Sequence, residues 1–356
     1  MSYTVTVARG MQPFALEQLA LNSCIVRRAA TEGKISFDCE DARKLLTLKC
    51  VERIFICIAS ESFEGATTNK KELFDILFAK CDPSLIASAF EELRNFQQFS
   101  FDSHKVDFRV SVRTSGKWKR KIDSEKLSSS IARYLKRRFM WRSVLREALF
   151  ELCIHISNED IFIGVPLSRI PLSSRPYLHR NGLRATVCDA MLSLGHIHEG
   201  HIILDLTCGS SSILMQAAHD LPQRCFLLGC DISEQSLHLS VMNRNHLEEF
   251  DKINHLVELI AADIHLDFLR LNAIDRIISD LPFGHQHANE EESLKIVKRV
   301  IDIFARCSLA CEAVLLVAAD HLPLVTSSLM GTSRLLTIYP LSLGNTQAAI
   351  LSLVNS

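Results

Sequence analysis

Apolar and polar residues alternate or recur with helical spacing along almost the whole chain, so the sequence predicts an α/β protein. In the first 60 residues the predicted order is strand, helix, strand, strand, helix, strand. The segments are a strand at 3–8, a helix at 13–22, a hairpin over 24–39, a helix at 39–49 and a strand at 51–60. This order is that of a ferredoxin-like split unit, which we place at residues 1–62.

A second α/β unit is predicted over residues 66–167, after a polar stretch of small residues at 61–70. Its helices are predicted at 70–80, 83–97 and 128–139, and its strands at 105–115, 148–157 and 160–167. Serines at the start of the 128–139 segment are suited to capping a helix. Residues 168–182 contain two prolines and are predicted to be a linker.

From residue 183 to 356 strands and helices alternate, which predicts a third domain with a parallel sheet covered on both faces. Strands are predicted at 201–209, 224–233, 256–265, 275–284 and 312–320, and helices at about 210–219, 234–249 and 291–309. The segments 333–344 and 347–354 predict an antiparallel end hairpin. The sequence therefore predicts a Rossmann-like sheet of seven strands.

Length and composition limit the class of protein that the chain can be. With 356 residues the chain suits two or three domains, and no apolar run is long enough to span a bilayer. The start lacks the pattern of a secretion signal, so we expect a soluble protein with no membrane partner. The 12 cysteines are scattered and form no CxxC pair, which favours a reducing compartment and no metal site.

Positive charge is concentrated in one segment, although the net charge of the chain is −1. Residues 113–146 hold twelve Lys and Arg against two acids, interleaved with Trp118, Tyr134, Phe139 and Trp141. Such a segment is often only a solvated face, but aromatic interleaving favours a surface for a phosphate backbone. The candidate RNA-binding residues are Arg113, Lys117, Lys119, Arg120, Lys121, Arg180 and Arg184. For the last two, a cofactor carboxylate or simple packing are open alternatives.

Four predicted strands of the third domain end in an acid: Asp205, Asp231, Asp263 and Asp280. In a doubly wound sheet, ligands bind beyond the carboxyl ends of the strands. One such acid is most often a cap or a turn. Four at intervals of about one βα unit predict a ligand site at that edge.

The loop after the first of these strands, "DLTCGSSS" (205–212), indicates which nucleotide binds. It is rich in small residues and precedes a helix, but it lacks the glycines of GxGxxG that a pyrophosphate needs. A nicotinamide dinucleotide is therefore disfavoured. S-adenosylmethionine fits better, because an acidic edge suits its cationic centre. Asp231 lies at the spacing of a ribose-binding carboxylate, and Asp263 with Ile264 is expected to frame the adenine.

The segment "SDLPFG" (279–284) suits methylation of an exocyclic amine on a purine. That nitrogen is a weak nucleophile because its lone pair is delocalised into the ring. Asp280 and the Leu281 carbonyl, held by Pro282, can accept its N–H groups. Phe283 offers a flat face on which a flipped base stacks. We therefore expect Asp280, Leu281, Pro282 and Phe283 to be the catalytic residues.

Motifs along nearly the whole chain resemble those of the THUMP-domain RNA guanine-N2 methyltransferases. They are "VARGMQPFALEQL", "VERIFICI", "FIGVPLSRIPLSSRPYL", "GLRATVCDAML", "ILDLTCG", "SDLPFG" and "YPLSLGNTQAAIL". The resemblance implies a class I methyltransferase sheet preceded by ferredoxin-like and THUMP RNA-binding domains. It also implies N2-methylguanosine formation in a structured RNA, with U6 small nuclear RNA favoured over tRNA. A small zinc-binding activator subunit and a location in the nucleus and/or cytoplasm are further expectations.

With this resemblance, the expected cofactor contacts are Asp205, Thr207, Cys208, Gly209, Ser210, Asp231, Ile232, Asp263 and Ile264. One position departs from the family, whose first loop usually has Cys-Gly-x-Gly where this chain has Ser211. A serine is accommodated there if its φ is negative. The departure leaves an alternative function open, that of a catalytically weak or inactive RNA-binding or assembly protein.

Overall fold

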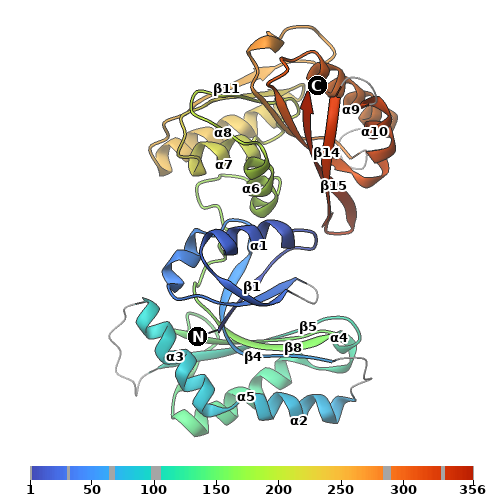
Figure 1. The fold of residues 1–356 in the computed structure, drawn as a ribbon. Coiled ribbons are helices and arrows are strands. Elements are labelled where there is room, and N and C mark those ends of the chain that lie inside the picture. Colours follow the sequence, from blue (N-terminus) through green and yellow to red (C-terminus); the bar gives the residue numbers. More distant parts are fainter. Residues whose placement is uncertain are drawn as a thin grey trace. The chain divides into compact units, whose positions relative to one another are not determined.

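The computed structural model describes residues 2–29, 33–63, 69–97, 106–283, 290–329 and 333–355. The chain forms two compact units (Figure 1). Unit 1 comprises Met1–Val7 and Ala15–Leu172, and unit 2 comprises Ala8–Phe14 and Ser173–Ser356. The division after residue 172 falls inside the predicted linker at 168–182. The finer division of the first 167 residues into two domains stays a prediction.

Unit 1 is built on an eight-stranded sheet of order β2-β3-β1-β4-β8-β7-β5-β6. The strands are β1 (Ser2–Thr6), β2 (Ile25–Ala29), β3 (Lys34–Asp38), β4 (Arg53–Ser62), β5 (Asp107–Thr114), β6 (Arg142–Ser143), β7 (Phe150–Ile156) and β8 (Asp160–Pro166). The first four strands pair antiparallel in the order of a ferredoxin-like unit. Antiparallel pairing of β4 with β8 continues the sheet into the second predicted unit.

The helices of this part of the chain are α1 (Gln12–Leu21), α2 (Lys70–Lys80), α3 (Pro83–Gln97), α4 (Trp118–Lys121) and α5 (Ser124–Phe139). Two sequence predictions were wrong in detail. The helix expected at 39–49 is a short 3₁₀-helix, η1 (Ala42–Thr47), which ends with a three-residue turn from the Leu48 N–H to the Leu45 carbonyl. The helix α5 begins four residues earlier than expected, because Asp123 rather than a serine accepts from the Lys126 N–H.

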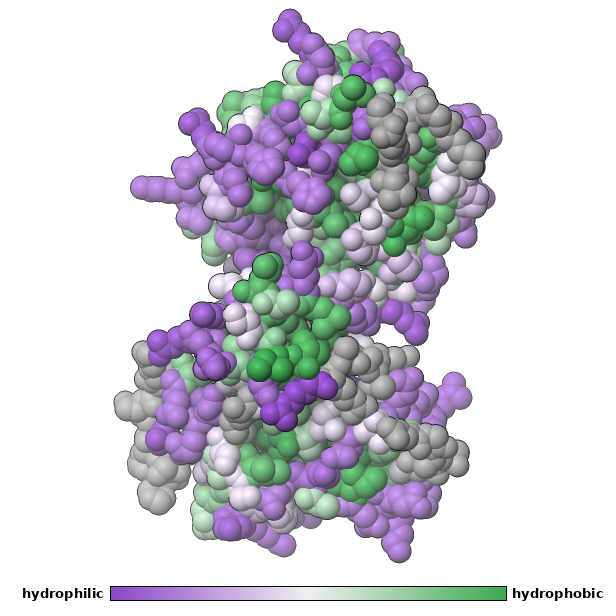
Figure 2. All heavy atoms as spheres, in the orientation of Figure 1, coloured by the Kyte–Doolittle hydropathy of each residue, from purple (hydrophilic) through white to green (hydrophobic). Residues whose placement is uncertain are grey.

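Exposed apolar side chains gather on one face of unit 1. Figure 2 shows this patch over the elements that are blue in Figure 1. The exposed side chains here include Leu21, Ile25 and Val26, from the end of α1 and from β2. Since β2 lies at the end of the sheet order, exposed Ile25 and Val26 lie on an edge strand, beside the exposed Arg27.

As predicted, unit 2 contains a seven-stranded sheet. Its strand order is β11-β10-β9-β12-β13-β15-β14. Its strands are β9 (Ile202–Asp205), β10 (Phe226–Asp231), β11 (Leu256–Ala261), β12 (Arg276–Asp280), β13 (Glu312–Ala318), β14 (Ser333–Leu343) and β15 (Thr346–Asn355). The first five pair parallel, and β15 pairs antiparallel with both β13 and β14. The antiparallel end hairpin is therefore confirmed.

Helices flank this sheet in two groups (Figure 1). One group is α6 (Ala185–Leu194), α7 (Ser212–Asp220) and α8 (Glu234–Phe250), and the other is α9 (Glu290–Ala305) and α10 (Leu322–Leu329). Sequence reasoning missed α6 and α10. A large buried cluster joins the strands to α9 and includes Leu204, Ile277, Val300 and Leu315. This core fixes the carboxyl ends of the parallel strands along one edge of the sheet.

Candidate functional site

Three of the four predicted acids end adjacent strands. Asp205 is the last residue of β9, Asp231 of β10 and Asp280 of β12, and β9 lies between the other two strands. Asp263 follows the end of β11 by two residues. The chain runs from β9 outward through β10 and β11 and then returns to β12 on the other side of β9. The switch point of the sheet therefore lies between β9 and β12, where ligands of such sheets bind.

The loop between β9 and α7 is held against Asp231. The N–H of Gly209 donates to Asp231 Oδ2 at 2.8 Å, and the N–H of Ser233 donates to Oδ1 at 2.8 Å. Gly209 has φ +54°, and a methyl group built on its Cα would meet no atom within 4 Å. The loop thus leaves open space beside a fixed carboxylate whose oxygens keep further lone pairs. That combination fits the ribose and amino-acid parts of S-adenosylmethionine.

Hydrogen bonds join β9 to β12 across the switch point. The N–H of Leu206 donates to Ser279 Oγ at 2.8 Å, and Thr207 Oγ1 donates to the carbonyl of Asp280 at 2.9 Å. Ser279 is completely buried. The loop that would hold a cofactor and the strand end that carries the proposed catalytic acid are therefore tied together.

Burial controls the charge of this edge. Asp205 is only 1% exposed, and its burial raises the pKa of its carboxyl to about 8, with the neighbouring charges of Asp280 and Asp231 acting in the same direction. Burial also raises the pKa of Asp280 to about 7. Ionising these two carboxyls without a nearby positive charge is costly. They therefore favour a cationic ligand, whose charge stabilises their ionised forms. The site thus suits the charge of S-adenosylmethionine.

The remaining predicted site residues differ in exposure. Leu281 and Ile264 are buried in the core cluster, and Cys208 is buried as well. Ile232 is 71% exposed. Pro282 and Phe283 are partly buried, and Gly284 of the sequence motif lies outside the described residues. The core position of Ile264 and Leu281 leaves their backbone groups, rather than their side chains, as the parts available to a ligand.

Asn243 of α8 joins the segment before α6 to the cofactor loop. Its side chain accepts from the N–H of Arg180 at 2.8 Å and donates to the carbonyls of Arg180 and Ser210. The N–H of Gly182 donates to Ser212 Oγ. The backbone around Arg180 is therefore fixed beside the loop, with the Arg180 and Arg184 side chains exposed.

Sequence reasoning missed the buried polar residues that hold these segments together. Besides Asn243 they include Ser240, Ser279 and Arg175, and Arg175 donates to Asn181, Gln216 and the carbonyl of Leu183. The available signal was a polar residue on the apolar side of a predicted helix or strand. That signal does not reveal the partner.

The basic segment of unit 1 presents its charges and buries its tryptophans. Lys119, Arg120 and Lys121 of α4 are exposed, as is Arg113 of β5. Trp118 is 1% exposed, with the Lys117 and Lys121 ammonium groups 5.0 and 5.9 Å from the centre of its ring. The ring of Trp118 therefore packs inside unit 1, and the surface of this segment is formed by its charged side chains.

The side chain of Trp141 is buried as well. It packs against Phe90, Phe108, Phe139 and Phe150, with ring centroids 4.5–6.0 Å apart. These four phenyl rings come from α3, β5, α5 and β7, and packing them with Trp141 removes a large apolar area from water. Among the four interleaved aromatics, Tyr134 is the exposed one, at 40%.

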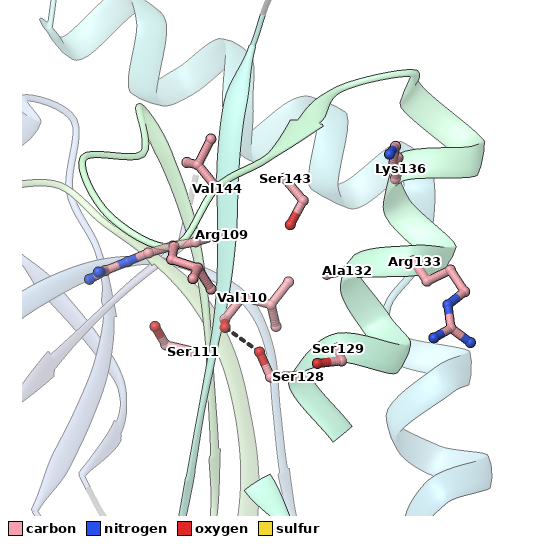
Figure 3. Close-up of a pocket in the computed structure, with 11 residues that line it drawn as sticks. Arg109, Val110, Ser111, Ser128, Ser129, Ala132, Arg133, Lys136, Ser143 and Val144 are labelled. Atoms are coloured by element: carbon pink, nitrogen blue, oxygen red, sulfur yellow. Dashed lines mark hydrogen bonds between the residues drawn. The ribbon is translucent and has the colours of Figure 1, made fainter. Parts of the chain in front are cut away.

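A pocket of about 410 Å³ opens between β5, α5 and β6 of unit 1 (Figure 3). The residues lining it include four serines and three cationic residues: Ser111, Ser128, Ser129, Ser143, Arg109, Arg133 and Lys136. In Figure 3 the guanidinium groups of Arg109 and Arg133 point away from the pocket. Arg109 pairs with Glu151 at 2.7 Å. The pocket is hydroxyl-rich, and the exposed charges of α4 are a stronger candidate for phosphate contact.

Within the described ranges, none of the helices has the length and apolar character needed to cross a membrane. The same part of the chain shows no group of three or more His, Cys, Asp or Glu side chains that could hold a metal ion.

Comparison with known proteins agrees with this geometry. Residues 173–335 match the family described as RMKL-like, methyltransferase domain. The mouse (Mus musculus) U6 snRNA (guanine-N(2))-methyltransferase THUMPD2 is 32% identical over 220 residues, which is 62% of this chain and 40% of the mouse protein. The chain thus spans less than half the length of this relative. The resemblance expected from the sequence motifs is confirmed.

Solved structures show the fold. The structure of TrmN from Thermus thermophilus has a TM-score of 0.73 and 19% identity, and the match covers 100% of this chain and 99% of TrmN. The structure of SMU.472 complexed with SAH has a TM-score of 0.70 and 13% identity, covering 99% of this chain and 97% of that protein. Unit 2 therefore has the Rossmann-like fold of a class I methyltransferase, and the chain is similar in sequence to THUMP-domain RNA guanine-N2 methyltransferases.

Proposed function

We propose that this protein is an S-adenosylmethionine-dependent RNA methyltransferase that forms N2-methylguanosine. The observation that carries the proposal is the position of Asp280 at the switch point, tied through its carbonyl to the loop that contains Gly209. Asp280 is followed by Leu281, Pro282 and Phe283, beyond the carboxyl end of the strand. This arrangement supports a base-binding segment beside the cofactor loop.

S-adenosylmethionine, when bound, supplies a methyl group on a positively charged sulfur. The carboxylate of Asp231 would accept hydrogen bonds from the ribose hydroxyls, and the open face of Gly209 would admit the amino-acid part. Asp205 would stabilise the positive charge, with Thr207, Cys208, Ser210 and Ile232 contributing mainly backbone. Asp263 and Ile264 would frame the adenine from the end of β11.

The guanine amine would be held by the segment after β12. Asp280 accepts one N–H of the base and the Leu281 carbonyl accepts the other, which keeps the nitrogen lone pair directed at the methyl group. Phe283 stacks on the base, and Pro282 restricts the backbone between them. Positive charge that develops on the nitrogen is stabilised by the Asp280 carboxylate. A guanine in a duplex reaches this segment only after leaving its base stack.

We propose U6 small nuclear RNA as the preferred substrate over tRNA. The name of the mouse relative, whose match covers 62% of this chain, supports it. Exposed Lys119, Arg120 and Lys121 support RNA binding by the region proposed as the THUMP domain, residues 66–167.

We propose a location in the nucleus and/or cytoplasm, where U6 small nuclear RNA and tRNA are found. Fluorescence microscopy of the tagged chain tests it.

The decisive experiment compares methyl transfer from labelled S-adenosylmethionine to U6 RNA and to tRNA transcripts. Asp280→Asn and Asp280→Ala should each lower the rate at least about a hundredfold, while RNA binding stays unchanged. Asp251→Asn, at the exposed end of α8, is the matched control. Full activity in both Asp280 variants would remove the proposed chemistry. Mapping of N2-methylguanosine in cells with and without the protein identifies the RNA.

A second function is favoured by one observation, the left-handed backbone of Ser211 at φ +57°. The sequence-based condition for a working serine was a negative φ, so the structure contradicts that condition. A strained cofactor loop suits a catalytically weak or inactive RNA-binding or assembly protein. Calorimetry with S-adenosylmethionine distinguishes the two functions.

We also propose a small zinc-binding activator subunit as a partner on unit 2. Supporting the proposal are exposed apolar side chains on the edge strand β11, Leu256 at 53% and Ile260 at 37%, with Leu266 at 65% shortly after it. The double change Leu256→Lys, Ile260→Lys should prevent co-purification with the activator while the circular dichroism of the chain stays unchanged. Co-purification that persists in the double variant would show that the activator does not bind at β11.

A further inference from the structure

The cofactor loop contains a serine in a backbone conformation that usually requires glycine. Ser211 has φ +57° and ψ +33°, and it caps α7 without a hydrogen bond from its side chain to the helix. In this left-handed region a Cβ crowds the backbone, so serine is less stable there than glycine. The Ser211 side chain is completely buried, so something other than solvent must hold it.

A chain of two hydroxyl groups holds the Ser211 side chain. Ser211 Oγ donates to Ser240 Oγ at 2.8 Å, and Ser240 Oγ donates to the carbonyl of Gly209 at 2.6 Å. Ser240 lies on α8 and is completely buried as well. The two hydrogen bonds therefore form a closed path from residue 211 back to residue 209 through α8.

This path directs the carbonyl groups of the loop. Ser240 binds the Gly209 carbonyl, and Asn243, one turn later on the same helix, donates to the Ser210 carbonyl at 2.8 Å. Both oxygens are thereby directed to α8. The anionic carboxylate of an amino-acid ligand would be repelled by carbonyl oxygens that faced it. Holding these oxygens on the helix side favours binding of such a ligand at the loop.

We propose that Ser211 and Ser240 form a hydroxyl relay that positions the cofactor loop and compensates for the missing glycine. The inference rests on the proposed function, because it concerns the affinity of the same loop for S-adenosylmethionine. Both serines are positioning residues, since they act through the carbonyl of Gly209. In a chain with glycine at 211 the relay would lose one member and the loop would lose its strain at the same time.

The test measures binding of S-adenosylhomocysteine by calorimetry in five variants of the full chain. They are Ser211→Ala, Ser240→Ala, the double variant, Ser211→Gly and the control Ser236→Ala. Ser236 lies one turn before Ser240 on α8 and is partly exposed. Ser211→Ala removes one hydrogen bond of the path and Ser240→Ala removes both. Each change interrupts the path, so each should weaken binding about tenfold. The double variant should match Ser240→Ala within about twofold, because both changes break one path.

Ser211→Gly should bind within about threefold of the unchanged chain, since it loses strain together with the hydroxyl. Losses that multiply to about a hundredfold in the double variant would show two independent serines and overturn the relay. Unchanged binding in Ser240→Ala would overturn it as well.

Amide hydrogen exchange without any ligand separates the relay from the proposed function. Exchange in a peptide covering residues 206–212 should accelerate in Ser240→Ala and stay unchanged in Ser236→Ala. If the unchanged chain fails to bind S-adenosylhomocysteine, the proposed cofactor is wrong, and exchange still decides the relay. Equal exchange in both variants overturns the relay whatever the chain binds.

Discussion

The hydroxyl of Thr207 donates to the backbone carbonyl of Asp280 at 2.9 Å, although 73 residues separate them in the chain. Thr207 lies just after β9, and Asp280 is the last residue of β12. The bond fixes the spacing between the cofactor loop and the proposed catalytic segment. A reaction that requires the two ligands in line depends on this spacing, because small displacements of reacting atoms slow such reactions strongly.

Removing that bond should therefore affect catalysis more than folding. Thr207→Val keeps the shape of the side chain but cannot donate to Asp280. We expect the rate of methyl transfer to fall about tenfold, as for loss of one hydrogen bond, with little change in S-adenosylhomocysteine affinity. Initial rates with saturating RNA measure the effect. Thr326→Val, at an exposed position of α10, is the control. A parallel loss of affinity and rate would indicate a general collapse of the loop instead.

The buried carboxyl of Asp205 predicts how stability depends on pH. Its pKa is raised from 3.8 to about 8 in the folded chain, so the folded state binds a proton more tightly than the unfolded state. This contribution is fully present below about pH 4 and is lost as the pH rises to about 8. The Tm of the cofactor-free chain should thus fall between pH 5.5 and 8.5, and less steeply in Asp205→Asn. Equal slopes in the two proteins would exclude a protonated Asp205.

The buried tryptophans predict a stability effect without an RNA effect. Trp118→Ala should lower the free energy of unfolding by about 3–5 kcal/mol, as for other large aromatic deletions in a core. Trp118→Phe should lower the free energy of unfolding by less and should leave RNA affinity unchanged. Tyr134→Ala serves as the comparison in which an exposed ring is removed. Urea unfolding and filter binding measure the two properties. A fall in RNA affinity in Trp118→Phe with unchanged stability would show that this ring contributes to RNA binding.

Exposed charges on α4 predict a steep salt dependence. Replacing Lys119, Arg120 and Lys121 by Ala should weaken RNA binding and reduce the slope of log affinity against log salt by up to about three. The matched control replaces Arg43, Lys44 and Lys71, which are also exposed in unit 1. RNA titrations between about 50 and 300 mM salt, over which the Debye length shortens, give the slopes. An equal change in both triple variants would indicate unspecific attraction.

Much of the fold was predictable because its signals are local. The strands β9, β10, β11, β12 and β13 are short apolar runs, and each predicted segment contains the observed strand. The ends of the helices and strands were less predictable. Helix α5, for example, begins earlier than expected because the Asp123 side chain caps its first turn. The buried Trp118 was also missed, since a basic segment shows its charges in the sequence but not which side chains turn inward.

The sequence by itself determined the alternation of elements, the seven-stranded sheet and the position of acids at strand ends. These follow from hydrophobic periodicity and from residue order, which are properties of neighbouring positions. Only the tertiary structure decided that Asp205, Asp231 and Asp280 end adjacent strands, and that Ser240 and Asn243 hold the loop. The reason is physical: a hydrogen bond between residues 31 or 73 positions apart depends on where the packed helices and strands place them, and no local pattern records that distance.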